Sequence, residues 1–238
     1  MKKEKGKVWF HARPSFHFNK TNSYSQGISE SFRAGSFVNK STNSSNGWSD
    51  MKDVKMEADV TIRQLWGKKN RTIIMSTDIR YGTSAALSDD SSFLETIGSP
   101  VSKKMRYDTD SRSLWLEGGV RYTEPLGEKW AISTAADYTW SKRSSIRDAF
   151  DNTGKNDYYS SESRTYYTVQ KYDLTAQYRF GQSGWITLGG SVYGVNNETV
   201  SKSYNVDNVT GKGEWQWSVT PNLRFQVNDD INRFQIYL

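Results

Sequence analysis

Apolar and polar residues alternate with a period of two along most of the chain. In residues 8–18, Val8, Phe10 and Phe16 share one phase, whereas His11 and Arg13 lie on the other. Because successive side chains of a β-strand point to opposite faces, this alternation predicts strands rather than helices. The same pattern recurs in residues 54–64, 73–81, 114–122, 130–140, 166–180, 186–193 and 215–227.

Charged residues within these eight segments keep to one phase. All of them lie on the polar phase and none on the apolar phase, which random placement would rarely achieve. One face of the predicted sheet therefore excludes charge, and we expect the other face to carry every one of these side chains: Arg13, Lys55, Glu57, Asp59, Arg63, Asp78, Arg80, Glu117, Arg121, Asp137, Lys171, Asp173, Arg179 and Arg224.

The predicted connections between strands alternate between short and long. Weaker alternation at 23–37 and 231–238 raises the predicted number of strands to about ten. Turn-like residues favour short connections, and the long ones are rich in Ser, Asn, Asp and Lys. The short connections fall at 19–22, 65–70, 123–129, 181–184 and 228–230, and the long ones at about 39–53, 83–112, 141–165 and 197–212.

Strand length and this rhythm favour a membrane barrel over a soluble sheet. Soluble strands are mostly about five or six residues long, whereas tilted membrane strands need about 9 to 11. Outer-membrane barrels also pair short periplasmic turns with longer extracellular loops. The low hydrophobic content of 35% and mean hydropathy of -0.79 exclude a helical membrane protein but suit strands that are apolar on one side only.

Aromatic residues, 14% of the chain, gather near the strand ends on the apolar phase. Trp and Tyr favour the boundary between hydrocarbon and water, so this layout predicts two aromatic girdles at the membrane interfaces. The fourteen charges would then face a polar lumen. The girdle residues are Phe10, Phe18, Tyr81, Tyr122, Trp130, Trp140, Tyr178, Phe180, Trp215 and Phe225.

Other chemistry is sparse in the sequence. The net charge of +6 is dispersed rather than clustered, which argues against a nucleic-acid partner. The absence of cysteine excludes disulfides and thiolate metal sites. We find no nucleotide-binding, nucleophile or metal-ligand motif, so we expect no enzyme activity, no metal and no cofactor.

Residues 114–130 contain a turn, Tyr122-Thr123-Glu124-Pro125-Leu126-Gly127, that resembles the periplasmic turn of the outer-membrane protein β-barrel family. That family occurs in TonB-dependent-receptor-like proteins. The resemblance implies an up-and-down transmembrane β-barrel in the outer membrane of a Gram-negative bacterium. It further implies a structural part of a transporter whose plug and remaining strands would be partners, together with outer-membrane lipid and an extracellular ligand.

No apolar stretch follows the charged start Met1–Lys7, so the chain shows no secretory signal. We therefore expect residues 1–238 to be one barrel segment, incomplete at both ends, of a larger barrel. Two alternatives stay open. One is a small complete ten-strand barrel acting as a pore, adhesin or protease. The other is a soluble carbohydrate-binding β-sandwich that uses the aromatic residues Tyr158, Tyr159, Tyr166 and Tyr167.

Overall fold

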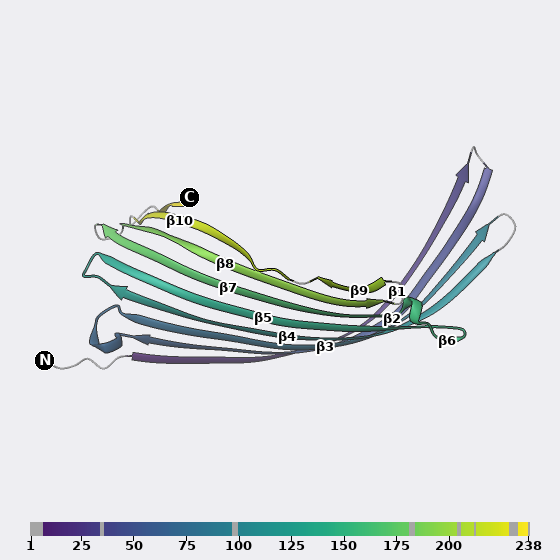
Figure 1. Ribbon diagram of the computed structural model, residues 1–238, viewed down its shortest axis with the longest axis horizontal. Coiled ribbons are helices and arrows are strands. Elements are labelled where there is room, and N and C mark those ends of the chain that lie inside the picture. The colour runs from purple at the N-terminus through teal and green to yellow at the C-terminus, as the bar shows by residue number, and fades with distance from the viewer. Residues whose placement is uncertain are drawn as a thin grey trace.

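The chain forms a single antiparallel sheet in the computed structural model (Figure 1). The structure describes residues 7–33, 36–96, 100–180, 184–203, 206–211, 213–228 and 233–237. Two short 3-10 turns, η1 (Leu65–Gly67) and η2 (Asp157–Tyr159), accompany the strands. The strands are β1 (Lys7–Arg33), β2 (Ser36–Arg63), β3 (Thr72–Thr96), β4 (Val101–Pro125), β5 (Trp130–Asp151), β6 (Gly154–Lys155), β7 (Ser161–Phe180), β8 (Gly184–Ser203), β9 (Val206–Gly211), β10 (Gln216–Asn228) and β11 (Arg233–Tyr237).

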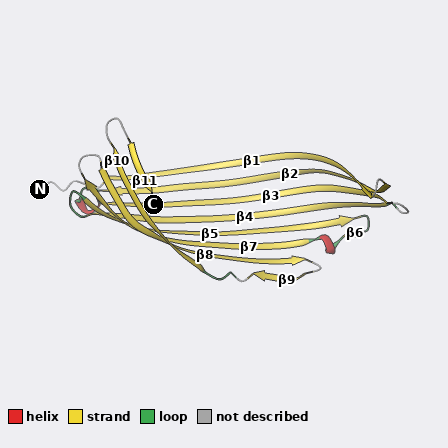
Figure 2. Cartoon of the chain, turned by 90° about the horizontal axis from the view of Figure 1, so that it is seen from above, coloured by secondary structure: helices red, strands yellow, loops and turns green. Residues whose placement is uncertain are grey.

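Neighbours in sequence are neighbours in the sheet. The main path runs β1-β2-β3-β4-β5-β7-β8-β10-β11, with β6 paired to β5 and β9 paired to β8. The all-β, antiparallel, up-and-down prediction is therefore confirmed. The sheet is curved but not closed, because β1 and β11 form its two edges among the described residues (Figures 1 and 2).

The predicted connections at one end of the sheet are wrong. Residues 19–22 are not a turn but the middle of β1, which pairs with β2 from Lys7↔Arg63 to Arg33↔Ser36. Most of the expected loops at 39–53, 83–112, 141–165 and 197–212 are strand as well. Strands reach 27 and 28 residues in β1 and β2. Paired hairpin stems, rather than long loops, extend the sheet on this side, which we call the hairpin side.

The opposite end, the turn side, matches the predicted short connections more closely. β2 and β3 are joined through η1, where Gln64, Trp66 and Asn70 adopt positive φ. β4 continues to Pro125, and a tight turn with Gly127 at φ 93° leads into β5. Glycine tolerates this left-handed conformation without the steric cost that a Cβ would bring. The predicted connections at 181–184 and 228–230 fall largely outside the described residues.

A packed interior is nearly absent from the described part of the sheet. Its buried apolar side chains are Met105, Ala135 and Ala149. Large apolar side chains are instead exposed, for example Phe10 at 69% and Val219 at 73%. All described strands belong to one sheet, so no second layer of described strands covers these side chains. Within the described residues, no helix has the length and apolar character needed to cross a membrane.

Candidate functional site

The strand register brings all fourteen predicted charges onto one face of the sheet. Directly paired residues of antiparallel strands point the same way, so each chain of partners traces one row on one face. One such row, running from β1 to β10, is Arg13↔Glu57↔Asp78↔Glu117↔Thr139↔Val169↔Val195↔Gln216. We call this the polar face. Whether it borders a lumen stays a prediction.

The other face, the apolar face, has four successive rows without an Asp, Glu, Lys or Arg. These rows begin on β1 at Val8, Phe10, Ala12 and Pro14. We call them the apolar band. A representative row is Phe10↔Val60↔Met75↔Val120↔Ala136↔Tyr172↔Val192↔Val219.

An ion-pair network occupies the polar face behind the apolar band. Lys55 contacts Glu57 and lies 3.6 Å from Asp78, which also binds Arg80. Trp115 donates its indole N–H to Glu117. Oppositely charged side chains thus neutralise one another across β2 and β3, so this part of the polar face carries little net charge.

A second polar cluster lies on β7, β8 and β10. Lys171 binds Asp173 at 2.9 Å, and the hydroxyl of Ser191 donates to the same carboxylate. The Arg224 guanidinium lies 4.8 Å from the ring centre of Trp185. These side chains line a hollow of about 770 Å³. Hydroxyl, charged and aromatic groups in such a hollow suit a polar solute or water rather than hydrocarbon.

The described girdle aromatics that belong to strands all lie on the apolar face. Near the turn side, Trp130 and Tyr178 are 4.7 Å apart, and Phe180 stacks on Phe225 at 5.6 Å. Trp215 immediately precedes β10 and stacks on Trp217. The remaining members take their face from the register: Phe10, Phe18, Tyr81, Tyr122 and Trp140.

The turn motif forms a polar clasp that sequence reasoning missed. The Glu124 carboxylate accepts hydrogen bonds from Lys68 at 2.5 Å, from Arg71 at 2.7 and 2.9 Å, and from the Tyr122 hydroxyl at 2.5 Å. The bond from Arg71 is the main reason that the pKa of Glu124 lies far below its ordinary value. Lys68 and Arg71 belong to the preceding turn, so no local spacing could have revealed them, whereas Pro125, Leu126 and Gly127 form the tight turn itself.

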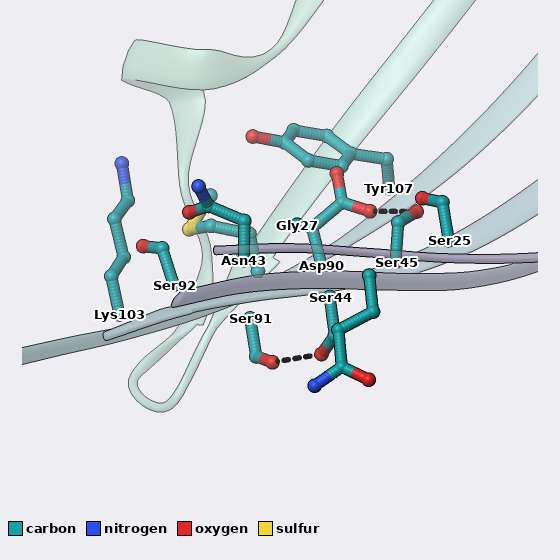
Figure 3. A pocket seen from close by; sticks show the side chains of 12 residues that line it. Ser25, Gly27, Asn43, Ser44, Ser45, Asp90, Ser91, Ser92, Lys103 and Tyr107 are labelled. Atoms are coloured by element: carbon teal, nitrogen blue, oxygen red, sulfur yellow. Dashed lines mark hydrogen bonds between the residues drawn. The ribbon is translucent and has the colours of Figure 1, made fainter. Parts of the chain in front are cut away.

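The hairpin stems form a hydroxyl-rich wall, with Ser45 and Asp90 on the polar face and the pair Ser44 and Ser91 on the opposite face (Figure 3). Ser45 and Ser88 both donate to Asp90 at 2.6 Å, and the hollow beside them measures about 570 Å³. The segment between β5 and β7 folds toward this wall, where the Lys103 ammonium lies 3.6 Å from the centre of the Tyr159 ring.

Other sequence candidates are not brought together. Of the aromatic residues named for a carbohydrate-binding site, Tyr166 and Tyr167 are adjacent in β7 and point to opposite faces. Tyr158 and Tyr159 pack edge to face in η2. In the part of the chain that the structure describes, no three His, Cys, Asp or Glu side chains are grouped to hold a metal ion.

Comparisons with other proteins identify no relative. No protein-family profile matches the chain, and neither a curated protein nor a solved structure is significantly similar to it.

Proposed function

We propose that this chain is a wall segment of an outer-membrane β-barrel, with the apolar face against lipid and the polar face toward an aqueous lumen. One observation carries the proposal: across the four rows of the apolar band, charge is confined to the polar face of a single-layered sheet, and the opposite face exposes large apolar side chains. In water, contiguous apolar patches rarely exceed a few hundred Å². Against hydrocarbon, the charge-free side chains of the apolar band would be favourably placed.

The dimensions of the charge-free zone support this assignment. On the apolar face of β4, Arg112 and Glu124 flank a stretch without charge. Twelve residue steps at a rise of about 3.4 Å span about 41 Å along the strand. At a tilt of about 27° to 40°, this corresponds to about 31 to 37 Å across a membrane, enough to cross a hydrocarbon core of about 30 Å.

The apolar segments are also staggered from strand to strand. The midpoint of segment 8–18 is Arg13, and the row that starts at Arg13 reaches β10 at Gln216. The midpoint of the apolar segment on β10, 215–227, is instead Pro221, five residues farther along that strand. A drift of about 17 Å over seven strand spacings of about 4.8 Å gives a tilt of roughly 27°. A tilted strand array is a requirement of barrel closure.

Closure requires strands beyond those described. The edge strand β1 leaves backbone N–H and C=O groups without a strand on one side, and such groups must be paired inside a membrane. We therefore propose that the sheet is completed by further strands, as in the transport barrels that the turn motif resembles. In a TonB-dependent-receptor-like transporter of Gram-negative bacteria, the polar face would line the path that a plug gates.

The membrane assignment can be tested with Trp140 and Trp115, which lie on opposite faces at nearly the same height because Leu116 pairs with Trp140. Two single-tryptophan variants, one keeping Trp140 and the other Trp115 with the remaining eight of the nine tryptophans replaced by phenylalanine, are reconstituted into vesicles of lipids with brominated acyl chains. We expect quenching of Trp140 fluorescence and little quenching of Trp115. Equal quenching of both, or recovery of the protein as a soluble monomer without lipid, would contradict the proposal.

A further inference from the structure

Three cations and no acid occupy the second row beyond the hairpin-side edge of the apolar band. This row, on the hairpin side of the apolar face, contains Lys52, Arg112 and Arg164, which we call the basic row. Its consecutive partners are Phe18↔Lys52↔Thr83↔Arg112↔Ser144↔Arg164↔Val200. A fourth cation, Lys142, lies one row nearer the band, with its ammonium 5.6 Å from the Tyr166 ring centre.

Acids on this part of the face mostly stand one row farther from the band. That next row contains Asp50, Asp110 and Glu162, together with Lys20 and Lys202. Lys52 lies 3.7 Å from Asp50, and Arg164 lies 2.6 Å from Glu162. Both cations remain more than half exposed, so these pairs are screened by solvent and leave the cations able to bind other anions.

The positions of cations and acids relative to the apolar band indicate which groups would meet lipid headgroups. Long basic side chains at the edge of a membrane can lay their apolar stems on the hydrocarbon and place their charged ends at the level of the headgroups. An acid in that position would be repelled by lipid phosphates. The basic row lies beyond the hairpin-side edge of the band. Asp50, Asp110 and Glu162 lie one row farther out, whereas Glu198 lies one row nearer the band.

The two edges of the band differ. On the turn side, the described edge carries aromatic residues such as Trp130 and Tyr178, and its acid Glu124 is already bound by Lys68 and Arg71. The exposed cations Lys52, Arg112 and Arg164 thus lie at the hairpin side of the apolar face, where Lys52 and Arg164 also form solvent-exposed ion pairs with Asp50 and Glu162. The two edges of the apolar band therefore differ in their exposed cations, and this difference distinguishes the hairpin side from the turn side.

We propose that the basic row binds phosphate-bearing lipid headgroups in the membrane leaflet on the hairpin side. This inference rests on the proposed function, because it requires the apolar band to lie in hydrocarbon. Consecutive members are two strands apart, about 10 Å, so each cation contacts a separate headgroup. Arg112 and Arg164 supply planar donors suited to two phosphate oxygens, and Lys52 supplies a point charge.

Urea unfolding of the full chain in vesicles tests the inference. Phosphatidylcholine vesicles are compared with vesicles containing one part in five of phosphatidylglycerol, at low ionic strength. The basic-row variant is Lys52→Gln/Arg112→Gln/Arg164→Gln. The control, Lys69→Gln/Lys104→Gln/Lys129→Gln, removes the same charge at exposed positions away from the row.

Each cation near an anionic surface contributes about a fivefold factor in an equilibrium constant, so three contribute on the order of 100-fold. We expect anionic lipid to raise the folding equilibrium constant of the wild type and of the control by about this factor, and high salt to abolish the gain. The basic-row variant should lose most of the gain. Free inorganic phosphate added to phosphatidylcholine vesicles should have no effect.

The outcomes separate the two proposals. If the wild type inserts equally well and shows no preference for anionic lipid, or if the control loses as much as the basic-row variant, the headgroup site is wrong and the membrane assignment stands. If free phosphate reproduces the stabilisation, the site binds soluble phosphate and the lipid proposal is overturned. If the protein inserts into neither kind of vesicle and is recovered as a folded, soluble monomer, both proposals fail.

Discussion

Placing an arginine on the apolar face should be far more costly than placing one on the polar face of the same strand. Met75 and Ser76 are adjacent in β3 and therefore lie at the same height on opposite faces. Met75 is 40% exposed and lies in the apolar row between Val60 and Val120. The variants Met75→Arg and Ser76→Arg thus differ only in the face that receives the charge.

The magnitude follows from the position of Met75 in the band. Its partner Val120 is four residues from Glu124 and eight from Arg112, and so lies two residues from the centre of the charge-free stretch. Two residues correspond to about 5 Å of depth at a tilt of about 40°. An arginine near the bilayer midplane costs about 2 to 4 kcal/mol, and we expect about 2 kcal/mol for Met75→Arg.

Urea unfolding in phosphatidylcholine vesicles measures this cost. Met75→Arg should lower the folding equilibrium constant about 30-fold, and Ser76→Arg should change the free energy of unfolding by less than about 0.5 kcal/mol. If the apolar face met water, both substitutions would be nearly neutral and Met75→Arg would improve solubility. Equal effects of the two variants, or a larger effect at Ser76, would refute the two-faced account.

Three further predictions concern the turns and a close strand contact. Because the pKa of Glu124 is lowered in the folded state, the bonds to its carboxylate stabilise the protein above about pH 4.5, and this stabilisation is lost as the pH falls. In the acid range, the free energy of unfolding should therefore depend less steeply on pH in Glu124→Gln than in the wild type. The control Glu128→Gln should keep the wild-type dependence. A hydrogen bond from Thr153 is the main reason that the pKa of Asp151 is lowered to about 2. The Asp151 carboxylate also accepts a bond from the backbone N–H of Thr153, so Asp151→Asn should speed hydrogen exchange of the Thr153 amide. Gly189→Ala should destabilise by about 1 to 3 kcal/mol in urea unfolding, because the new Cβ would lie 2.3 Å from a backbone oxygen, whereas Gly190→Ala, with 3.4 Å of room, should be nearly neutral.

The strands and their faces could be predicted because alternation is a local property. A residue such as Val60 or Asp59 must point to one side or the other, and the sequence period specifies which residues share a side. The register then joined the separate phases into two continuous faces.

The hairpin stems could not be predicted by the same reasoning. Around Asn22 and Asn46, both faces of β1 and β2 carry polar residues. A strand that is polar on both faces has the composition of a loop and lacks the alternation that identifies a strand. Backbone pairing, rather than burial, holds such stems together. The Glu124 clasp was missed for a different reason, because Lys68 and Arg71 reach it from another turn.

Accessibility along one strand tests the central claim most directly. The chain contains no cysteine, so single cysteines at positions 73 to 79 of β3 can be spin-labelled without background. In lipid vesicles, labels at 73, 75, 77 and 79 should collide with oxygen dissolved in the hydrocarbon, and labels at 74, 76 and 78 with a water-soluble nickel reagent. Uniform exposure to the nickel reagent, or the opposite alternation, would contradict the account.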